Sequence, residues 1–357
     1  MSKAAELANL IGNINAGGGG AGRNLIGNGK FVVAQRGTSF SNVTSSQFCL
    51  DRFSADVGGG GAFNVTQDTS APEGFEKSLK MEVNTADSSI ATSDAYRVAT
   101  AIEGQDFSQS DWGSSTAKAC VLSFYVKSSV TGTYGVGFAN SAETENYIAE
   151  YTINSANTWE KKTISVPLRT SGTWLTNNGQ GVGIRWDLGS GTAYNGTAGA
   201  WQTTSSKVYR TSSCVNLIAT ANATWFLTGV QFEIGQNPTS FEHEPVERTL
   251  AKCERYYENS FPLGNFPSSY TGGHGYHTTA FPDGNAPGTY FRTLKRAAPT
   301  VTLRPQSSTT TGQVSSNGTD RSATATNINA KQVSYIAITS GTGSAYVRYM
   351  YEADAEL

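Results

Sequence analysis

The chain has 357 residues, longer than one small core usually supports, so more than one folding unit is expected. Charged residues make up only 15% and aromatic residues 11% of the chain, and 39 residues are glycine. This composition is typical of a β-rich, loop-rich protein. The net charge of -2, from 26 basic and 28 acidic residues, excludes the basic footprint expected of a protein that binds nucleic acid or an anionic membrane.

No stretch reaches the roughly 20 apolar residues of a membrane span, and the N-terminus carries no apolar run of the kind found in secretory signals. We therefore expect a chain that folds in the compartment where it is made, without membrane insertion. The four cysteines are scattered without CxxC spacing, which predicts buried thiols. They are Cys49, Cys120, Cys214 and Cys253.

Residues 4–14 predict a short helix with a coiled-coil seam, formed by Ala4, Leu7, Ile11 and Ile14 at spacings of three, four and three. Isoleucine at both seam positions favours trimers. Two heptads do not hold together alone, so a docking or oligomerising peptide and a frayed monomeric helix fit the pattern equally well. The glycine-rich run that follows predicts a flexible joint, so residues 1–23 are taken as a separate N-terminal peptide.

From residue 24 the apolar period changes to two, which predicts half-buried antiparallel strands. Many short strands separated by Gly/Ser/Asn-rich turns, without helices between them, predict a two-sheet sandwich of jelly-roll type over residues 24–245. The predicted strands are FVVAQ, SLKMEV, YRVATAI, ACVLSFYVK, NYIAEYTI, WEKKTISVP, GVGIRWDLG and TWFLTGVQFEIG.

Residues 246–260 predict one amphipathic helix, because Val246, Leu250, Cys253 and Tyr257 recur at helical spacing after Pro245. Strand patterns resume beyond it and predict a smaller C-terminal β domain over residues 261–357. The predicted strands there are TYFRTLK, TVTLRP, VSYIAIT and AYVRYMYEA. The overall expectation is an all-β chain in which a single helix connects two β domains.

Five segments, in this order and spacing, resemble a large group of bacteriophage virion proteins labelled tail fibre or minor structural proteins. The resemblance runs from about residue 24 to the C-terminus and leaves out the N-terminal peptide. It implies a carbohydrate-binding-module-like jelly roll, the connecting helix and a small C-terminal β domain, often in a trimeric appendage. The segments are RNLIGNGKFVVAQRGTSF, LDRFSAD, LTGVQFEIGQNPTSFEHEPVERTLAKCERYYE, KRAAPTVTL and YEADAEL.

Catalytic and metal motifs are not evident in the sequence. There is no GxSxG or HExxH, and the three histidines are His243, His274 and His277. The acidic pairs Glu143/Glu145 and Asp106/Asp111 have the residue types of a glycosidase, but carboxylates in loops are more often solvated or cap turns. A structural calcium ion is left open: Asp51, Asp56 and Asp68 are near one another in sequence but lack the ordered spacing of a calcium loop. No cofactor is expected.

The sequence favours glycan binding over catalysis or metal binding, because sugars stack on Trp or Tyr while polar side chains bind their hydroxyls. The candidates in or beside Gly/Ser/Asn-rich loops are Trp112, Trp174, Tyr194 and Trp201, although burial under a loop is the commoner fate of such aromatic residues. Trp186 shares a strand face with Val182 and Ile184 and is expected in the core. A second group of candidates, for a distal tip or a subunit contact, is Tyr270, Tyr276, His277 and Tyr290.

These observations lead to a first hypothesis: a non-enzymatic, oligomeric virion structural protein, a tail or head fibre that attaches to the host surface, with glycans as the candidate receptor. Residues 1–23 would then contact neighbouring tail or capsid proteins. Two alternatives remain: a capsid decoration or cement protein, and a polysaccharide depolymerase. Exposed Trp174 and Trp201 rings would favour glycan binding, and buried rings would favour a purely structural role.

Overall fold

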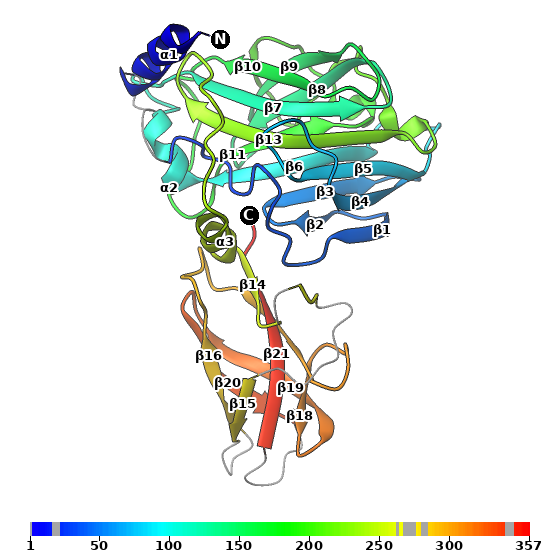
Figure 1. The fold of residues 1–357 in the computed structure, drawn as a ribbon, viewed down its shortest axis with the longest axis vertical. Helices are drawn as coiled ribbons and strands as arrows, with labels where there is room; N and C mark the ends of the chain where they lie inside the picture. The colour runs from blue at the N-terminus through cyan, green and yellow to red at the C-terminus, as the bar shows by residue number, and fades with distance from the viewer. Residues whose placement is uncertain (1, 16–21, 262–263, 267–275, 280–284, 340–345) are drawn as a thin grey trace. The chain divides into compact units, whose positions relative to one another are not determined.

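The computed structural model describes residues 2–15, 22–261, 264–266, 276–279, 285–339 and 346–357. The described chain is nearly all β and forms two compact units (Figure 1). The first unit contains residues 1–32 and 38–245, and the second contains residues 33–37 and 246–357. The all-β fold expected from the sequence is confirmed.

The first unit is a sandwich of two antiparallel sheets. One sheet has six strands, in the order β1 (Ser39–Val43), β4 (Ala62–Asp68), β5 (Ser78–Thr85), β13 (Thr224–Ile234), β7 (Cys120–Ser128), β10 (Glu160–Val166). The other has seven, in the order β12 (Trp201–Thr203), β9 (Glu145–Ile153), β8 (Gly132–Ala139), β11 (Gln180–Asp187), β6 (Ala95–Glu103), β3 (Phe53–Gly58), β2 (Gln47–Leu50). A short helix α2, Gly104–Phe107, follows β6.

Aromatic side chains fill the space between the two sheets. Trp186 of β11 lies 5.9 Å from Phe124 of β7, and Phe124 lies 5.2 Å from Tyr151 of β9, measured between ring centroids. Trp186 is fully buried, as the sequence predicts. Because these rings point inward, the residues between them in each strand point away from the core.

The predicted strand FVVAQ is wrong. Phe31 has a φ of 55°, in the left-handed region that interrupts a regular strand and that a bulky residue rarely adopts, and its ring lies 4.6 Å from that of Phe53 in the core of the first unit. Residues 33–37 form part of the second unit instead, where Gln35 donates to the Tyr257 carbonyl and Asn259 donates to the Gln35 carbonyl.

Helix α1 spans Lys3–Asn15, so the predicted N-terminal helix is confirmed. The seam residues Leu7 and Ile11 are 57% and 49% exposed. The side chain of Ile14 and the glycine-rich run at 16–21 lie outside the described residues.

Helix α3 spans Val246–Glu254, shorter than the predicted 246–260. It ends early because Tyr257–Asn259 forms β14, which pairs with the last strand β21 (Tyr346–Asp354). Cys253 and Tyr257 of the predicted stripe are buried, whereas Val246 is 50% exposed and Thr249, outside the stripe, is buried, so the stripe is confirmed only in part.

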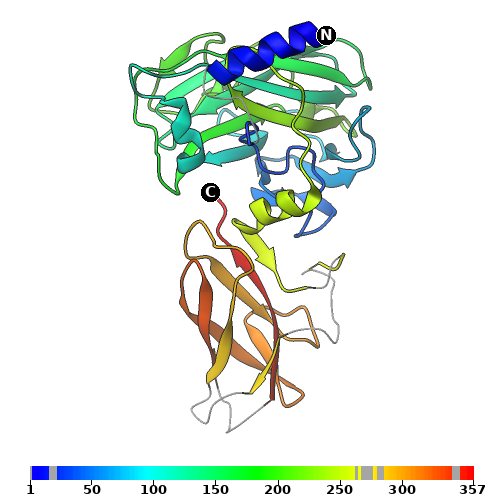
Figure 2. The ribbon, with the colours of Figure 1, turned by 60° about the vertical axis from the view of Figure 1, so that its left-hand side comes forward.

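The second unit is built around β21, the red strand in Figures 1 and 2, which pairs with strands on both sides. The predicted strand TYFRTLK is corrected: β16 ends at Tyr290, and of the residues that follow, Phe291 and Lys295 are buried whereas Leu294 is exposed. The remaining strands are β15 (Tyr276–Thr279), β16 (Asn285–Tyr290), β17 (Thr300–Arg304), β18 (Gln313–Ser316), β19 (Thr319–Ile328) and β20 (Gln332–Ile338).

All four cysteines are free thiols and buried, as predicted. Burial raises the pKa of Cys120 and of Cys214. The thiolate is the reactive form of cysteine, so these side chains act as small apolar residues of the core.

A buried ion pair fixes residues 291–296 against β14. Lys295 Nζ lies 2.6 Å from Glu258 Oε2, and both side chains are fully buried. Glu258 also accepts hydrogen bonds from the Tyr351 hydroxyl at 2.5 Å and from the Arg292 backbone amide at 3.0 Å. Burial lowers the pKa of Lys295, so the charge on this lysine depends on Glu258.

We expect Glu258→Gln to destabilise the second unit by about 3–5 kcal/mol, because it leaves the buried Lys295 without a counter-charge. All six tryptophans lie in the first unit, so fluorescence excited at 295 nm reports that unit alone. Urea unfolding should therefore show an earlier transition by circular dichroism and an unchanged one by tryptophan fluorescence. Glu247→Gln, on the exposed side of α3, is the control. Equal stability of the two variants would contradict the role given to this pair.

Candidate functional site

Three of the four predicted glycan-binding residues lie together. The ring centroids of Trp112 and Trp174 are 4.8 Å apart, those of Trp112 and Trp201 are 5.1 Å apart, and those of Trp174 and Trp201 are 5.7 Å apart. Phe107 of α2 packs edge-on against Trp112 at 4.9 Å. The four rings form one cluster, here called the tryptophan cluster.

The tryptophan cluster is packed inward. Trp112 is 6% and Trp174 is 8% exposed, and Trp201 is half-buried. Each indole N–H donates to a backbone carbonyl, at distances of 2.7, 3.1 and 2.9 Å for Trp112, Trp174 and Trp201. Because rings and N–H groups are both engaged, the cluster stabilises loops of the first unit and offers a ligand little beyond the exposed part of Trp201.

The fourth candidate, Tyr194, lies apart from the cluster. Its ring stacks on Tyr209 with centroids 4.8 Å apart, and its hydroxyl donates to the Ser93 carbonyl at 3.0 Å. Tyr194 is half-buried, whereas Tyr209 is fully buried. Arg97 of β6 lies over the Tyr209 ring, at 4.8 Å from the ring centroid, so Tyr194 adjoins the outer face of the seven-stranded sheet.

The register of five strands places a row of residues across that outer face. The pairs are Phe48↔Ser54, Ser54↔Ala99, Ala99↔Arg185 and Arg185↔Gly137. Directly opposed residues project from the same face of a sheet, so these five residues form a line, here called the cross-strand row. It covers four strand spacings, about 19 Å.

Ion pairs hold the side chains of this face in place. Arg97 Nε lies 2.8 Å from Asp56 Oδ2, and Arg185 Nη2 lies 2.6 Å from Glu143 Oε1. Lys207 lies 3.0 Å from the other oxygen of Glu143. Three cationic groups share two carboxylates, so the face presents many hydrogen-bonding groups and a small positive net charge.

Arg185 is 8% exposed and has donors that the described part of the protein does not use. Its one hydrogen bond in the described chain is the Nη2 contact with Glu143, which leaves Nε and Nη1 as donors without a protein acceptor. Burial, together with the neighbouring Arg97, lowers the pKa of Arg185. A further acceptor would therefore stabilise its charge, and a sugar hydroxyl is such an acceptor.

Glycine at position 137 allows one end of the row to be covered. A Cβ there would lie 2.3 Å from Tyr209 Cβ, closer than atoms can approach. The segment that carries Tyr209 therefore lies directly on β8, and Tyr194 stacks on it. Phe48, half-buried, lies at the other end of the row. Aromatic residues thus border a floor of Ser54, Ala99 and Arg185.

Three of the four residues in the predicted acidic pairs are engaged by cations. Glu143 contacts Arg185 and Lys207, whereas Glu145 lies in an ion pair with Arg169. Asp111 lies 3.3 Å from Lys118. No pair of free carboxylates facing each other is found among these residues, so nothing in them favours the depolymerase hypothesis.

The three aspartates considered for calcium are not brought together. Asp56 pairs with Arg97, Asp68 accepts a hydrogen bond from the Ser70 backbone amide, and Asp51 is fully buried. In the described part of the chain, no group of three His, Cys, Asp or Glu side chains is placed to hold a metal ion. No described helix is long and apolar enough to cross a membrane.

The distal-loop candidates are described only in part. Tyr270 lies outside the described residues, while Tyr276 and His277 belong to β15 and pair with Tyr349 and Arg348 of β21; their side chains lie outside the description. Tyr290 is 64% exposed at the end of β16. Its use in binding stays a prediction.

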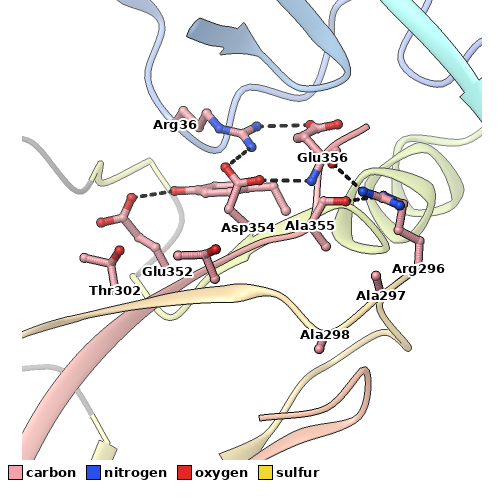
Figure 3. Close-up of a pocket in the computed structure, with 11 residues that line it drawn as sticks. Arg36, Arg296, Ala297, Ala298, Thr302, Glu352, Asp354, Ala355 and Glu356 are labelled. Atoms are coloured by element: carbon pink, nitrogen blue, oxygen red, sulfur yellow. Dashed lines mark hydrogen bonds and ion pairs between the residues drawn. The ribbon is translucent and has the colours of Figure 1, made fainter. Parts of the chain in front are cut away.

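The second unit contains a pocket of about 580 Å³ that sequence reasoning missed (Figure 3). Its polar lining includes Arg36, Tyr257, Glu352, Asp354 and Glu356. The three acidic residues alternate along the end of the chain, a signal for one shared strand face. Arg36 gave no such signal, because it reaches the pocket from a segment more than 200 residues away in sequence.

The comparisons with known proteins do not assign this chain to a family. No protein-family model and no curated protein matches the chain. Among solved structures, the enzymatically active domain of bacteriophage CBA120 tailspike protein 4 aligns at TM-score 0.32 and 12% identity, over 59% of this chain and 21% of that one.

A putative sugar-binding protein from Bacteroides thetaiotaomicron aligns at TM-score 0.32 and 12% identity, over 59% of this chain and 99% of that one. A family 11 carbohydrate-binding module of a Clostridium thermocellum cellulase aligns at TM-score 0.28 and 12% identity, over 59% of this chain and 100% of that one. The chain aligns with about a fifth of the tailspike structure. At these TM-scores the matches carry no argument about ligand or activity.

We expect Trp174→Ala to destabilise the first unit by about 3–5 kcal/mol, because it removes a large buried ring from the tryptophan cluster. Calorimetry should show a lower melting temperature. Leu168→Ala, a substitution at a 45% exposed residue before the same loop, should change the stability by less than about 0.5 kcal/mol. Little loss of stability in Trp174→Ala would contradict a packing role for this ring.

Proposed function

We propose that this chain is a non-enzymatic structural protein of a bacteriophage particle, an oligomeric tail or head fibre that attaches to a neutral host-surface glycan. The attachment site is the outer face of the seven-stranded sheet, along the cross-strand row. The observation that carries the proposal is that the Nε and Nη1 donors of Arg185 have no protein acceptor in the described chain, on a side chain fixed by Glu143.

The chemistry of this face suits a neutral polyhydroxylated ligand. The cationic groups of this face are already paired with carboxylates, so a strongly charged ligand gains little, while fixed carboxylates and guanidinium groups bind hydroxyls as acceptors and donors. Side chains already held by ion pairs lose little conformational freedom on binding, which favours affinity. The virion assignment is supported by the resemblance of the five sequence segments.

Oligomerisation is proposed to occur through α1. Leu7 and Ile11 are exposed at heptad spacing, and an isolated helix of 13 residues is marginally stable in water. Association of three copies would bury this seam, while the N-terminal peptide contacts a neighbouring virion protein. Two heptads contribute little alone, so further contacts between copies are needed.

A capsid decoration protein is the second candidate, and the burial of the tryptophan cluster favours it. The aromatic platform that would have indicated sugar binding is engaged internally at Trp112 and Trp174. In such a protein, the outer face of the sheet would contact a capsid neighbour instead of a glycan.

We expect Arg185→Ala to weaken glycan binding by about 10- to 150-fold, because a hydrogen bond to a charged group contributes about 1.5–3 kcal/mol. The wild-type chain would be screened on an array of bacterial capsular and lipopolysaccharide glycans, and affinities for the bound glycan measured by calorimetry. Arg248→Ala, an exposed arginine of α3, is the control. The proposed site would be refuted by unchanged affinity in Arg185→Ala, and glycan attachment by a wild-type chain that binds nothing on the array.

We expect the double substitution Leu7→Asp/Ile11→Asp to convert a trimer into monomers, because it places charges along the seam. Sedimentation equilibrium measures the mass. Ala5→Asp adds a charge to the same helix off the seam and should leave the trimer intact. A monomeric wild-type chain, or a double variant of unchanged mass, would show that α1 does not join the copies.

A further inference from the structure

The pocket of the second unit has the composition of a binding site for a small hydroxylated ligand. Its volume of about 580 Å³ lies within the range of about 300–1,000 Å³ typical of small-molecule sites. All of its lining residues belong to one unit. The lining consists of Arg36, Tyr257, Arg296, Ala297, Ala298, Thr300, Thr302, Glu352, Asp354, Ala355 and Glu356.

Arg36 is fixed at one side of this pocket (Figure 3). Its guanidinium lies 3.6 Å from the centroid of the Tyr257 ring, and its two terminal nitrogens lie 2.9 Å from Asp354 and 3.4 Å from Glu356. The Tyr257 hydroxyl donates to Glu352 at 3.0 Å. These contacts fix the carboxylates, so their remaining lone pairs point in set directions.

The charges around the pocket balance. Arg36 neutralises Asp354 and Glu356 in part, and Arg304 Nε lies 2.7 Å from Glu352 Oε1. Arg296 binds the carbonyls of residues 355 and 356, at 2.5 and 2.7 Å. Three carboxylates thus face three guanidinium groups. A strongly charged ligand gains little here, while a neutral ligand with several hydroxyls meets both donors and acceptors.

Two threonine side chains of the pocket, Thr300 and Thr302, have hydroxyls that are available to hydrogen-bond a ligand. Thr300 is paired with Asp354 and Thr302 with Glu352 in the β17–β21 ladder, so each hydroxyl lies beside a carboxylate on the same face. Neither hydroxyl makes a hydrogen bond within the described chain, whereas both carboxylates do. Two alanines in the lining, Ala297 and Ala298, add an apolar wall suited to the C–H face of a sugar ring.

We propose that this pocket binds a neutral saccharide unit and is a second glycan site in the chain. The inference rests on the proposed attachment function, and names a site for it in the second unit. Fixed acceptors on Asp354 and Glu352 and the unused hydroxyls of Thr300 and Thr302 would bind the sugar hydroxyls. Two sites on one chain, repeated in an oligomer, raise the effective concentration of the second contact once the first has formed.

The test uses Thr300→Val/Thr302→Val in the full chain. Valine keeps the shape and strand preference of threonine and removes only the hydroxyls, so folding should be unaffected. Thr324→Val, an exposed threonine of β19 outside the pocket, is the matched control. Asp354→Asn is a second probe, which keeps the size of the side chain and weakens it as an acceptor.

Each variant would be compared with wild type and Arg185→Ala on the same array of bacterial surface glycans, with affinities from calorimetry. We expect the double valine variant to lose at least about 5-fold in affinity for one or more neutral glycans, since it removes two hydrogen bonds to the ligand. Thr324→Val should bind as wild type does.

The outcomes separate the two proposals. Binding that is lost in Arg185→Ala and unchanged in the double valine variant and in Asp354→Asn would overturn the pocket inference alone. Binding lost in the pocket variants and unchanged in Arg185→Ala would support the pocket and refute the sheet face. A wild-type chain that binds no glycan on the array would overturn both.

Discussion

The alternation of side chains along an extended strand links the core of the first unit to its outer face. Trp186 must point inward to pack against Phe124, so Arg185 and Asp187 must point outward from the same strand. The same constraint acts on β6, where Arg97 lies between the buried Tyr96 and Val98. The charged face of the seven-stranded sheet is therefore a geometric consequence of its aromatic core, and ion pairs make that face compatible with partial burial.

The second unit uses the same constraint at the end of the chain. Glu352, Asp354 and Glu356 occur at every second position, and their side chains line one pocket. Arg36 completes that pocket from a distant part of the sequence and stacks on Tyr257. Both candidate sites thus consist of fixed, mutually neutralising charged groups beside unused donors or acceptors, a combination suited to uncharged ligands with many hydroxyls.

The fold could be predicted from sequence wherever the apolar period was clear. Trp186, most strands and both longer helices follow from local patterns. The prediction failed for FVVAQ, because the positive φ of Phe31 is set by packing that a local pattern does not encode. It was incomplete for α3, whose end depends on pairing of Tyr257–Asn259 with a strand almost 100 residues later.

The candidate sites were harder to predict for a similar reason. Trp112, Trp174 and Trp201 were chosen for their loop context, and the structure brings them together but packs them inward. The cross-strand row depends on the register of five strands, and the order of those strands in the sheet does not follow their order in the sequence. Nothing in the sequence therefore indicated that Arg185 belongs to a candidate site, beyond its expected outward position beside Trp186.

The most direct test of the account is the position of this chain in an intact particle, determined by cryo-electron microscopy. We expect a few copies in each appendage, joined through α1, with the outer face of the seven-stranded sheet uncovered and turned away from the particle. Many copies lying on the shell, with that face covered by capsid neighbours, would contradict attachment and establish a decoration protein instead.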